Sequence, residues 1–459
     1  MTAFLLFLAA HAVLVMRPSE LIPGADGVQF YLPLIAAAVL ASTPRLLYLV
    51  RQNSLINQPV PTAVIGLVAA VGISHASNGD LSLAVTSSLM MLKTAVYVLV
   101  LITVITTPRR LRTFLAVTAI SGAVMIASSV VSYRQFVADW SGRDDLLEVY
   151  REDRMRPLQD KVLTHVVEFE EIDDVNLRQP FFRMRGYGIF GDPNDLSTLI
   201  LFSLIVSLFF LRSREIGKIR YLWLINIALL LYAQSCTQSR GGLVSAAVAL
   251  SVFCLMKYGK RAVIILGLLF LAASPVVAGR MASFSLEDGT GQERIQLWSD
   301  GLLQLQTGRA IFGIGEGRYA DISGMRLKAH NSWIHAFTEL GLFGGLLFFS
   351  CAFFPALGFW RLKRAGIVPE DPILRRLLPF IPAMLAGLCF ALCALSRCYT
   401  PATYMVFGTA AAYLNIVGYR LNPPRPIVRL SNWTISLCVA YGLALLLATF
   451  VFVKIFVRF

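Results

Sequence analysis

Charged residues are scarce in this sequence. They make up 15% of the 459 residues, whereas hydrophobic residues make up 56%. A soluble domain has about 25% charged residues, and here the apolar residues also come in long blocks. The composition therefore excludes an ordinary soluble protein and predicts an all-α integral membrane protein.

Cysteine patterns typical of metal sites and disulfide frameworks are lacking. The seven cysteines fall mostly inside apolar segments, and Cys389 and Cys393 lie one helical turn apart with no histidine beside them. We interpret all seven as small apolar residues. The sequence therefore predicts neither a metal site nor disulfide bonds.

A basic region is lacking at the N-terminus, and the first apolar segment is soon followed by another. We interpret the first segment as a retained helix and not as a cleaved signal peptide. A membrane-spanning helix needs roughly 17 to 25 residues, and we predict 12 to 13 such helices. The expected spans are residues 2–16, 28–43, 60–76, 83–106, 113–133, 196–212, 219–236, 240–256, 261–279, 331–359, 377–394, 402–418 and 432–453.

Basic residues gather in alternate short loops. The loops that begin near Arg45, Arg109, Arg212, Lys257, Arg361 and Arg420 hold most of them, and the intervening short loops hold only Arg17, Arg240 and Arg397. Lys and Arg concentrate in cytoplasmic loops. We therefore predict a cytoplasmic N-terminus, and the net charge of +14 requires no nucleic-acid partner.

Two long loops are expected outside, within one membrane domain overall. The predicted parts are N-terminal helices (1–133), a first loop (134–195), central helices (196–279), a second loop (280–330) and C-terminal helices (331–459). Helical spacing in the first loop predicts short amphipathic helices that include Leu146, Val149, Tyr150 and Leu158. In the second loop a helix around Arg294 is expected to have an apolar face of Ile295, Leu297, Trp298, Leu302 and Leu303.

Three expected helices begin outside with polar sequences. Their predicted N-caps are Asn194 or Asp195, Ser239, and Asn331 or Ser332. A helix N-terminus favours anions because its backbone N–H groups are unpaired. Arg240 adds a planar fork of donors, and Gly241 and Gly242 permit close approach to the backbone. This combination predicts a site for an anionic lipid headgroup.

Simpler interpretations remain open for the same residues. An interfacial arginine commonly contacts lipid phosphates without further function, and paired glycines can serve helix packing alone. Asp192 and Asn194 can be turn and cap residues, and two acids around a proline are weak evidence for a cation site. The GxGxG pattern of Gly313, Gly315 and Gly317 follows no expected strand, so we exclude a dinucleotide site.

The order of several motifs resembles a known family. "SRGG" opens a helix at residue 239, and "ERIQLW", "FGIGEGRY" and "HNSWIHAFTELGLFGGLLF" follow in the second loop and the next helix. Together they resemble the O-antigen ligase and O-antigen polymerase superfamily over about residues 180–350. "GIFGDPNDLS" is similar to a segment of such proteins. The resemblance implies a GT-C-like membrane fold in the bacterial inner membrane.

The resemblance also implies an activity. Members transfer a glycan from undecaprenyl diphosphate to a sugar hydroxyl at the periplasmic face, without a cofactor or a required metal. The acceptor is a growing glycan or lipid A core, and other polysaccharide-assembly proteins are candidate partners. By resemblance, Arg240 and Arg294 bind the diphosphate of the donor, and His330 activates the attacking hydroxyl.

Five further residues are candidates for substrate contacts: Arg185, Asn194, Ser239, Gly241 and Asn331. The main alternative function is a lipid or polysaccharide transporter or flippase, and a third is a scaffold or sensor. Transporters typically show intramembrane charges and repeated halves. Here only Lys93 and Glu339 are expected inside spans, and the sequence shows no internal symmetry, which favours the transferase.

Overall fold

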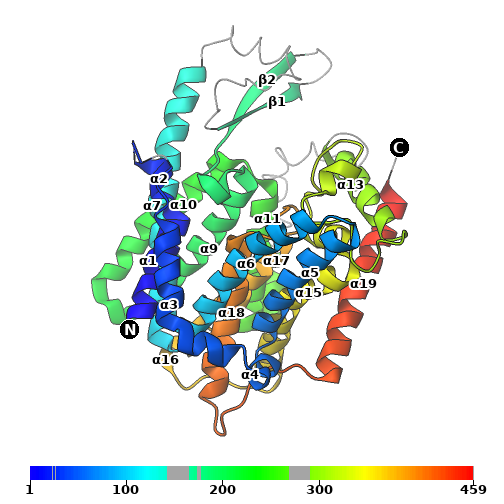
Figure 1. Cartoon of the computed structure of the whole chain (residues 1–459). Helices are drawn as coiled ribbons and strands as arrows, with labels where there is room; N and C mark the ends of the chain where they lie inside the picture. The colour runs from blue at the N-terminus through cyan, green and yellow to red at the C-terminus, as the bar shows by residue number, and fades with distance from the viewer. Residues whose placement is uncertain (23, 26, 142–164, 173–176, 268–289, 458–459) are drawn as a thin grey trace. The chain divides into compact units, whose positions relative to one another are not determined.

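The structure, a computed structural model, describes the chain except residues 23, 26, 142–164, 173–176, 268–289 and 458–459. The regular secondary structure of the described residues is helical except for one β-hairpin (Figure 1). The longer helices are α1 (Thr2–Met16), α3 (Tyr31–Leu49), α5 (Pro59–Ser77), α6 (Leu81–Val104), α7 (Pro108–Trp140), α9 (Pro193–Leu211), α10 (Leu222–Thr237), α11 (Arg240–Tyr258), α13 (Thr290–Gln304), α15 (Ser332–Arg364), α17 (Phe380–Ala391), α18 (Pro401–Tyr419) and α19 (Asn432–Phe456). The shorter ones are α2 (Pro18–Leu21), α4 (Gln52–Asn57), α14 (Tyr319–Ile322), α16 (Pro372–Leu377), and the 3-10 helices η1 (Gly188–Phe190) and η2 (Arg214–Tyr221).

Ten helical segments in the described part of the chain are long and apolar enough to cross a membrane. The prediction of an all-α integral membrane protein is therefore confirmed. Expected span 2–16 corresponds to the shorter apolar helix α1, and 402–418 corresponds to α18, which is not one of the ten. Expected span 261–279 lies partly outside the described residues. The GT-C-like arrangement stays a prediction.

Local sequence determines where several helices begin. Ser239 accepts a hydrogen bond from the N–H of Gly242, and Asn331 accepts from Trp333 and Ile334, so both predicted caps are confirmed. The assignment of the α9 cap to Asn194 or Asp195 was wrong, because Asp192, the alternative turn or cap residue, is the cap and Pro193 is the first helical residue. Proline suits that position because the first turn needs no N–H donor.

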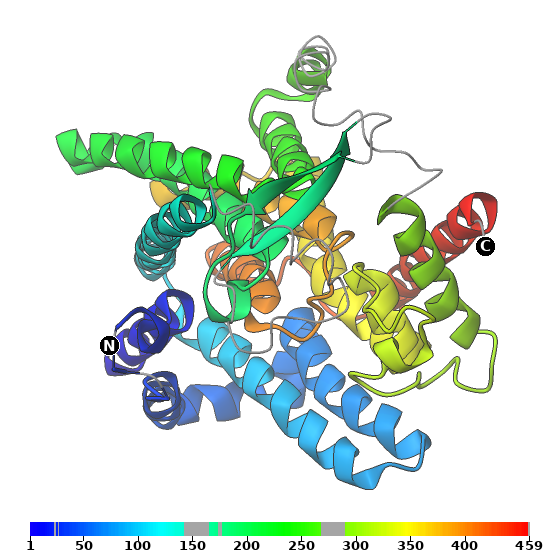
Figure 2. The same cartoon turned by 90° about the horizontal axis from the view of Figure 1, so that it is seen from above.

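The chain folds into two compact units, which are described separately. The larger unit holds residues 1–7, 34–114 and 244–459. In it, α15 packs against α5, α13, α17, α18 and α19, and α6 packs against α5 and α18. Figure 2 shows α5 and α6 side by side. Tyr97, Phe348 and Phe407 are buried in this core, whereas Lys93, near the middle of α6, is exposed.

The smaller unit holds residues 8–33 and 115–243. Here α9 packs against α10, and α7 continues to Trp140, beyond the predicted end at residue 133. An antiparallel hairpin, β1 (Val166–Ile172) and β2 (Leu177–Arg183), lies in the expected first loop. No strand was predicted there. The expected amphipathic helices with Leu146 to Leu158 lie outside the described residues.

Candidate functional site

A polar network joins the starts of α9 and α11 in the smaller unit. The Ser239 hydroxyl donates to the Asn194 side-chain oxygen at 2.7 Å, and the guanidinium of Arg183 reaches the same oxygen at 3.3 Å. Arg183 also donates to the carbonyl of Thr237 at 3.2 Å. Two predicted site residues, Asn194 and Ser239, are therefore in direct contact. Sequence reasoning missed Arg183, although it lies two residues before Arg185.

Arg240 is the first residue of α11, and its side chain is exposed. It follows Ser239, which is 1% exposed and caps the helix. The first turn of α11 is thus fixed by Ser239 and Asn194, and Arg240, the residue after the cap, is exposed. This arrangement presents a cation and the positive end of a helix together.

The two glycines after Arg240 differ in what the structure requires of them. A Cβ on Gly242 would collide with the Ser197 hydroxyl, and the Gln234 amide nitrogen lies close by. Ser197 and Gln234 are themselves hydrogen-bonded at 2.7 Å. Close helix packing therefore accounts for Gly242, as the simpler interpretation held, and the role of Gly241 in ligand approach stays a prediction.

Arg185 is held near this network by a buried histidine that sequence reasoning missed. His165 is 2% exposed, and its Nδ1 accepts the backbone N–H of Arg185 at 3.4 Å. Its Nε2 lies 3.1 Å from the Ser132 hydroxyl, and its ring packs edge-on against Tyr133 and Phe136. Burial, and then the charge of Arg185, lowers the pKa of His165 to about 4.

This pKa predicts that the smaller unit loosens in acid. An unfolded histidine binds a proton below about pH 6.5, whereas folded His165 binds one only near pH 4. The unfolded state therefore binds more protons between these values, and stability falls as the pH falls through that window. We expect the Tm of the wild type to drop more steeply from pH 6.5 to 4.5 than that of His165→Asn, whose amide can accept the same N–H. Parallel Tm curves would contradict this prediction.

His330 lies just before α15 in the larger unit. Its backbone is left-handed, with φ 47°, and its N–H donates to the Ser396 hydroxyl at 2.9 Å. The next residue, Asn331, is 6% exposed and uses its side-chain oxygen to cap α15. Ser332 accepts the N–H of Arg397 and donates to the carbonyl of Leu395. The backbone around His330 is therefore tightly held.

Helix α13 carries Arg294 and is fastened to the same end of the larger unit. The indole of Trp298, one turn after Arg294, donates to the carbonyl of Ala329 at 2.7 Å. Ala329 is the residue before His330, so the structure links the helix of Arg294 to the backbone that carries His330. The predicted apolar face is buried at Ile295, Leu297 and Leu302, but Leu303 is 49% exposed and does not belong to it.

Helix α15 is broken at Gly341, where φ is 65° and ψ is −167°. Residues 310–315 of the second loop fill the break with backbone hydrogen bonds. The N–H groups of Ile314 and Gly315 donate to the carbonyls of Thr338 and Glu339, and those of Leu342 and Phe343 donate to Ala310 and Ile311. The expected span 331–359 is thus two helical segments joined to a loop.

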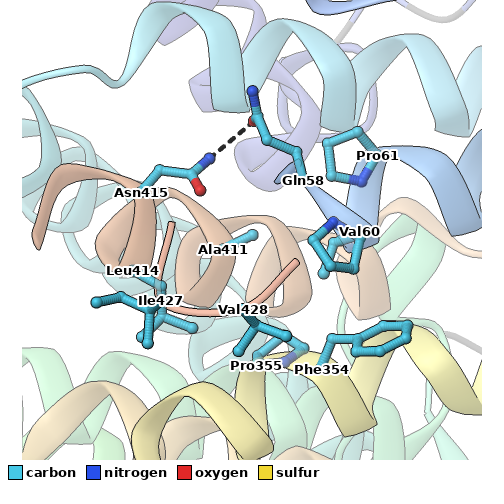
Figure 3. Close-up of a pocket in the computed structure, with 11 residues that line it drawn as sticks. Gln58, Val60, Pro61, Phe354, Pro355, Ala411, Leu414, Asn415, Ile427 and Val428 are labelled. Atoms are coloured by element: carbon cyan, nitrogen blue, oxygen red, sulfur yellow. Dashed lines mark hydrogen bonds between the residues drawn. The ribbon is translucent and has the colours of Figure 1, made fainter. Parts of the chain in front are cut away.

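A pocket lies at the other end of α15, around Pro355 (Figure 3). It is lined mainly by apolar side chains, and its two amide residues pair with each other, since Asn415 donates to Gln58 at 2.8 Å. The lining contains no charged side chain and none of the predicted site residues. Its chemistry does not suit a diphosphate.

The predicted residues fall into two groups, one in each unit. Arg185, Asn194, Ser239, Arg240 and Gly241 belong to the smaller unit, and Arg294, His330 and Asn331 belong to the larger unit. In the part of the chain that the structure describes, no three His, Cys, Asp or Glu side chains gather as a metal site would require.

Part of the chain is similar to a known protein family. Residues 225–349 match a family model described as O-antigen ligase. None of the curated proteins compared matches the chain. The matched residues begin inside α10 and end inside α15, so they include Arg240, Arg294 and His330. The segment "GIFGDPNDLS", which contributed to the predicted resemblance, precedes them.

Proposed function

Because the chain carries an O-antigen ligase region over residues 225–349, we propose that it transfers a glycan from undecaprenyl diphosphate to a sugar hydroxyl. It is a multi-pass membrane protein of the O-antigen ligase and polymerase type. We place the reaction at the periplasmic face of a bacterial inner membrane. The observation that carries the proposal is that the matched residues include Arg240, Arg294 and His330.

In the proposed reaction the acceptor hydroxyl attacks the anomeric carbon of the donor directly. The new glycosidic bond forms as the bond to the diphosphate breaks, and the anomeric centre is inverted. Arg240, Arg294 and the N-terminus of α11 stabilise the diphosphate, which leaves with the bonding electron pair. His330 takes the proton of the hydroxyl, because an unperturbed imidazole titrates near neutral pH. No metal takes part in this scheme.

We favour a polymerase over a ligase, because the two long outer loops suit a growing glycan as acceptor. A transporter is the runner-up. The contacts of Glu339 support the transferase over the transporter: this buried carboxylate is hydrogen-bonded to His335, Tyr319 and Tyr399. Such a group serves the structure better than an ion pathway, where intramembrane acids line water-filled cavities.

The test is transfer by the purified full chain from a polyprenyl-diphosphate-linked glycan. We expect Arg240→Ala to slow transfer by about 10²- to 10³-fold, the effect of removing one donor to a developing charge. Arg240→Lys should recover part of the rate, since an ammonium lacks the planar fork. Arg309→Ala is the control, because Arg309 is exposed in the second loop.

The same assay separates the alternatives. Elongation of the lipid-linked glycan alone indicates a polymerase, and transfer to added lipid A core indicates a ligase. Movement of the donor across vesicles without any new glycosidic bond would overturn the proposed function, whereas full transfer activity in Arg240→Ala would overturn the proposed role of Arg240. Loss of transfer on adding a chelator would overturn the metal-independent scheme.

A further inference from the structure

Glu339 is a fully buried carboxylate that binds three separate segments of the larger unit. One of its oxygens accepts the Nε2–H of His335 at 2.9 Å and the backbone N–H of Tyr319 at 3.1 Å. The other accepts the hydroxyl of Tyr399 at 2.8 Å. Its side chain is 0% exposed. Four residues thus form a network around the buried carboxylate, which we call the Glu339 network: Tyr319, His335, Glu339 and Tyr399.

One arm of the network leads to His330. Tyr399 belongs to the segment 392–400, which connects α17 to α18. Ser396 in this segment accepts the backbone N–H of His330, and Ser332 binds the segment at Leu395 and Arg397. The hydrogen bond from the Tyr399 hydroxyl to Glu339 therefore fixes segment 392–400 to α15. This segment in turn holds the backbone of His330.

A second arm leads to the helix of Arg294. The N–H of Tyr319 is bound by Glu339, and the hydroxyl of Tyr319 donates to the carbonyl of Leu297 in α13 at 2.7 Å. Leu297 lies three residues after Arg294. The carboxylate thus acts on α13 through one tyrosine and on the segment 392–400 through another.

Both tyrosines act as hydrogen-bond donors. Burial raises the pKa of the Tyr319 and Tyr399 hydroxyls, and the negative charge of Glu339 raises both further. Each hydroxyl therefore keeps its proton at neutral pH. The network is closed around the carboxylate, which has accepted hydrogen bonds on both oxygens, as a buried acid requires.

Packing alone does not account for this arrangement. A buried carboxylate is costly to desolvate, and a well-packed apolar side chain of similar volume is often as stable or more so. The carboxylate instead fixes the relative positions of these segments, because three hydrogen-bond donors from different segments converge on its oxygens. Two of those segments lead to residues of the proposed transfer reaction.

We propose that Glu339 is a positioning residue for glycan transfer, which acts through Tyr399 on His330 and through Tyr319 on α13. This inference rests on the proposed function, since it assigns His330 and Arg294 to the reaction. A displacement of about 1 Å at a reacting group can cost a factor of about 10² in rate. Removing the hydrogen bond through Tyr399 or through Tyr319 should therefore slow transfer, although every group that contacts the substrate is still present.

The first test removes one hydroxyl. We expect Tyr399→Phe to lower kcat about 10-fold with little change in donor KM. Tyr413→Phe is the matched control: Tyr413 is 0% exposed in the same unit and donates a comparable hydrogen bond, 2.9 Å long, to the carbonyl of Leu374. We expect this control to retain the wild-type kcat. Equal rates in the two variants would overturn the inference.

The second test separates positioning from loss of folded protein. If Tyr399 acts through His330, then Tyr399→Phe should add little to the defect of His330→Asn. A merely structural role would instead lower the rate by the same factor in both backgrounds. A double variant whose loss of rate equals the product of the two single losses would therefore contradict the proposal.

Substitution of Glu339 itself provides a rescue experiment. Glu339→Gln keeps an oxygen for His335 and Tyr319, and the Tyr399 hydroxyl can turn to accept from its amide. Glu339→Leu removes all three interactions at similar size. We expect the Gln variant to retain more activity than the Leu variant. Equal loss in both would contradict positioning by hydrogen bonds.

These experiments distinguish the two levels of inference. If the wild type transfers no glycan, the proposed function fails whatever Glu339 does. If the wild type and His330→Asn are equally active, the proposed role of His330 fails, and the role of Glu339 fails with it. If the wild type is active and His330→Asn is not, but Tyr399→Phe matches Tyr413→Phe, only the role of Glu339 fails.

Discussion

Replacement of His330 by alanine is expected to slow glycan transfer by about 10²- to 10⁴-fold, the usual contribution of a general base. Donor binding should change little, because the diphosphate is assigned to the two arginines. The backbone at His330 is left-handed and hydrogen-bonded to Ser396. The backbone position from which the imidazole side chain extends is therefore fixed. Steady-state kinetics of the purified chain measure both effects.

The left-handed backbone calls for a second variant at the same position. Asparagine tolerates a positive φ better than alanine does, and its amide cannot take a proton at neutral pH. His330→Asn should therefore lose activity while keeping the local fold. Lys328→Ala, an exposed change two residues earlier, should retain the wild-type rate. Wild-type kcat in both His330 variants would exclude the proposed base.

The kinetics should also depend on pH in a defined way. A general base must be unprotonated, so kcat/KM should fall in acid, where the base of the free protein takes up a proton. External imidazole should restore part of the activity of His330→Ala if the missing group is a proton acceptor. Unchanged rates with imidazole across the pH range, together with a flat wild-type profile, would favour a positional role for His330.

Gly341→Ala is expected to destabilise the chain by about 3 kcal/mol, since its φ and ψ fall in a region open almost only to glycine. The new Cβ would also press against the carbonyl of Ile311 in the loop that fills the break in α15. A side chain there must either push the loop out or rewind the helix. Thermal unfolding of the purified protein in detergent measures the loss.

A neighbouring glycine provides the control for this prediction. Gly308 has no atom within 4 Å of the position its Cβ would take, and its φ is not positive. Gly308→Ala should therefore leave stability within about 0.5 kcal/mol of the wild type. Gly313→Ala, facing the carbonyl of Glu339, should resemble Gly341→Ala. Wild-type unfolding of Gly341→Ala would show that the break is not required.

Hydropathy and capping chemistry predicted much of the fold because both are local properties. The apolar blocks predicted the long helices, and Ser239 and Asn331 predicted where α11 and α15 begin. The apolar face of α13 was also readable, because helical spacing places Ile295, Leu297 and Leu302 toward one side. Leu303 was assigned wrongly, since this face ends one residue earlier.

The remaining features depend on partners that are distant in the sequence. The break at Gly341 is stabilised by backbone hydrogen bonds from residues 310–315, and a glycine within an apolar run is equally compatible with an unbroken helix. Arg183 and Ser396 gained their roles from contacts with Thr237 and His330. The cap of α9 was assigned to Asn194 or Asp195 and not to Asp192 because all three residues, which lie within four positions, have suitable side chains.

The break in α15 also bears on how the chain enters the bilayer. At 1.5 Å per residue, the part after Gly341, Leu342–Arg364, is long enough by itself to cross about 30 Å of hydrocarbon. During synthesis, Leu342–Arg364 alone is therefore long enough to insert as a membrane-spanning helix. The preceding turns, with His335 and Glu339, then need not pass through lipid and can be enclosed by protein once α5, α13 and the second loop are present. Such late enclosure avoids exposing an ionisable pair to hydrocarbon during biogenesis.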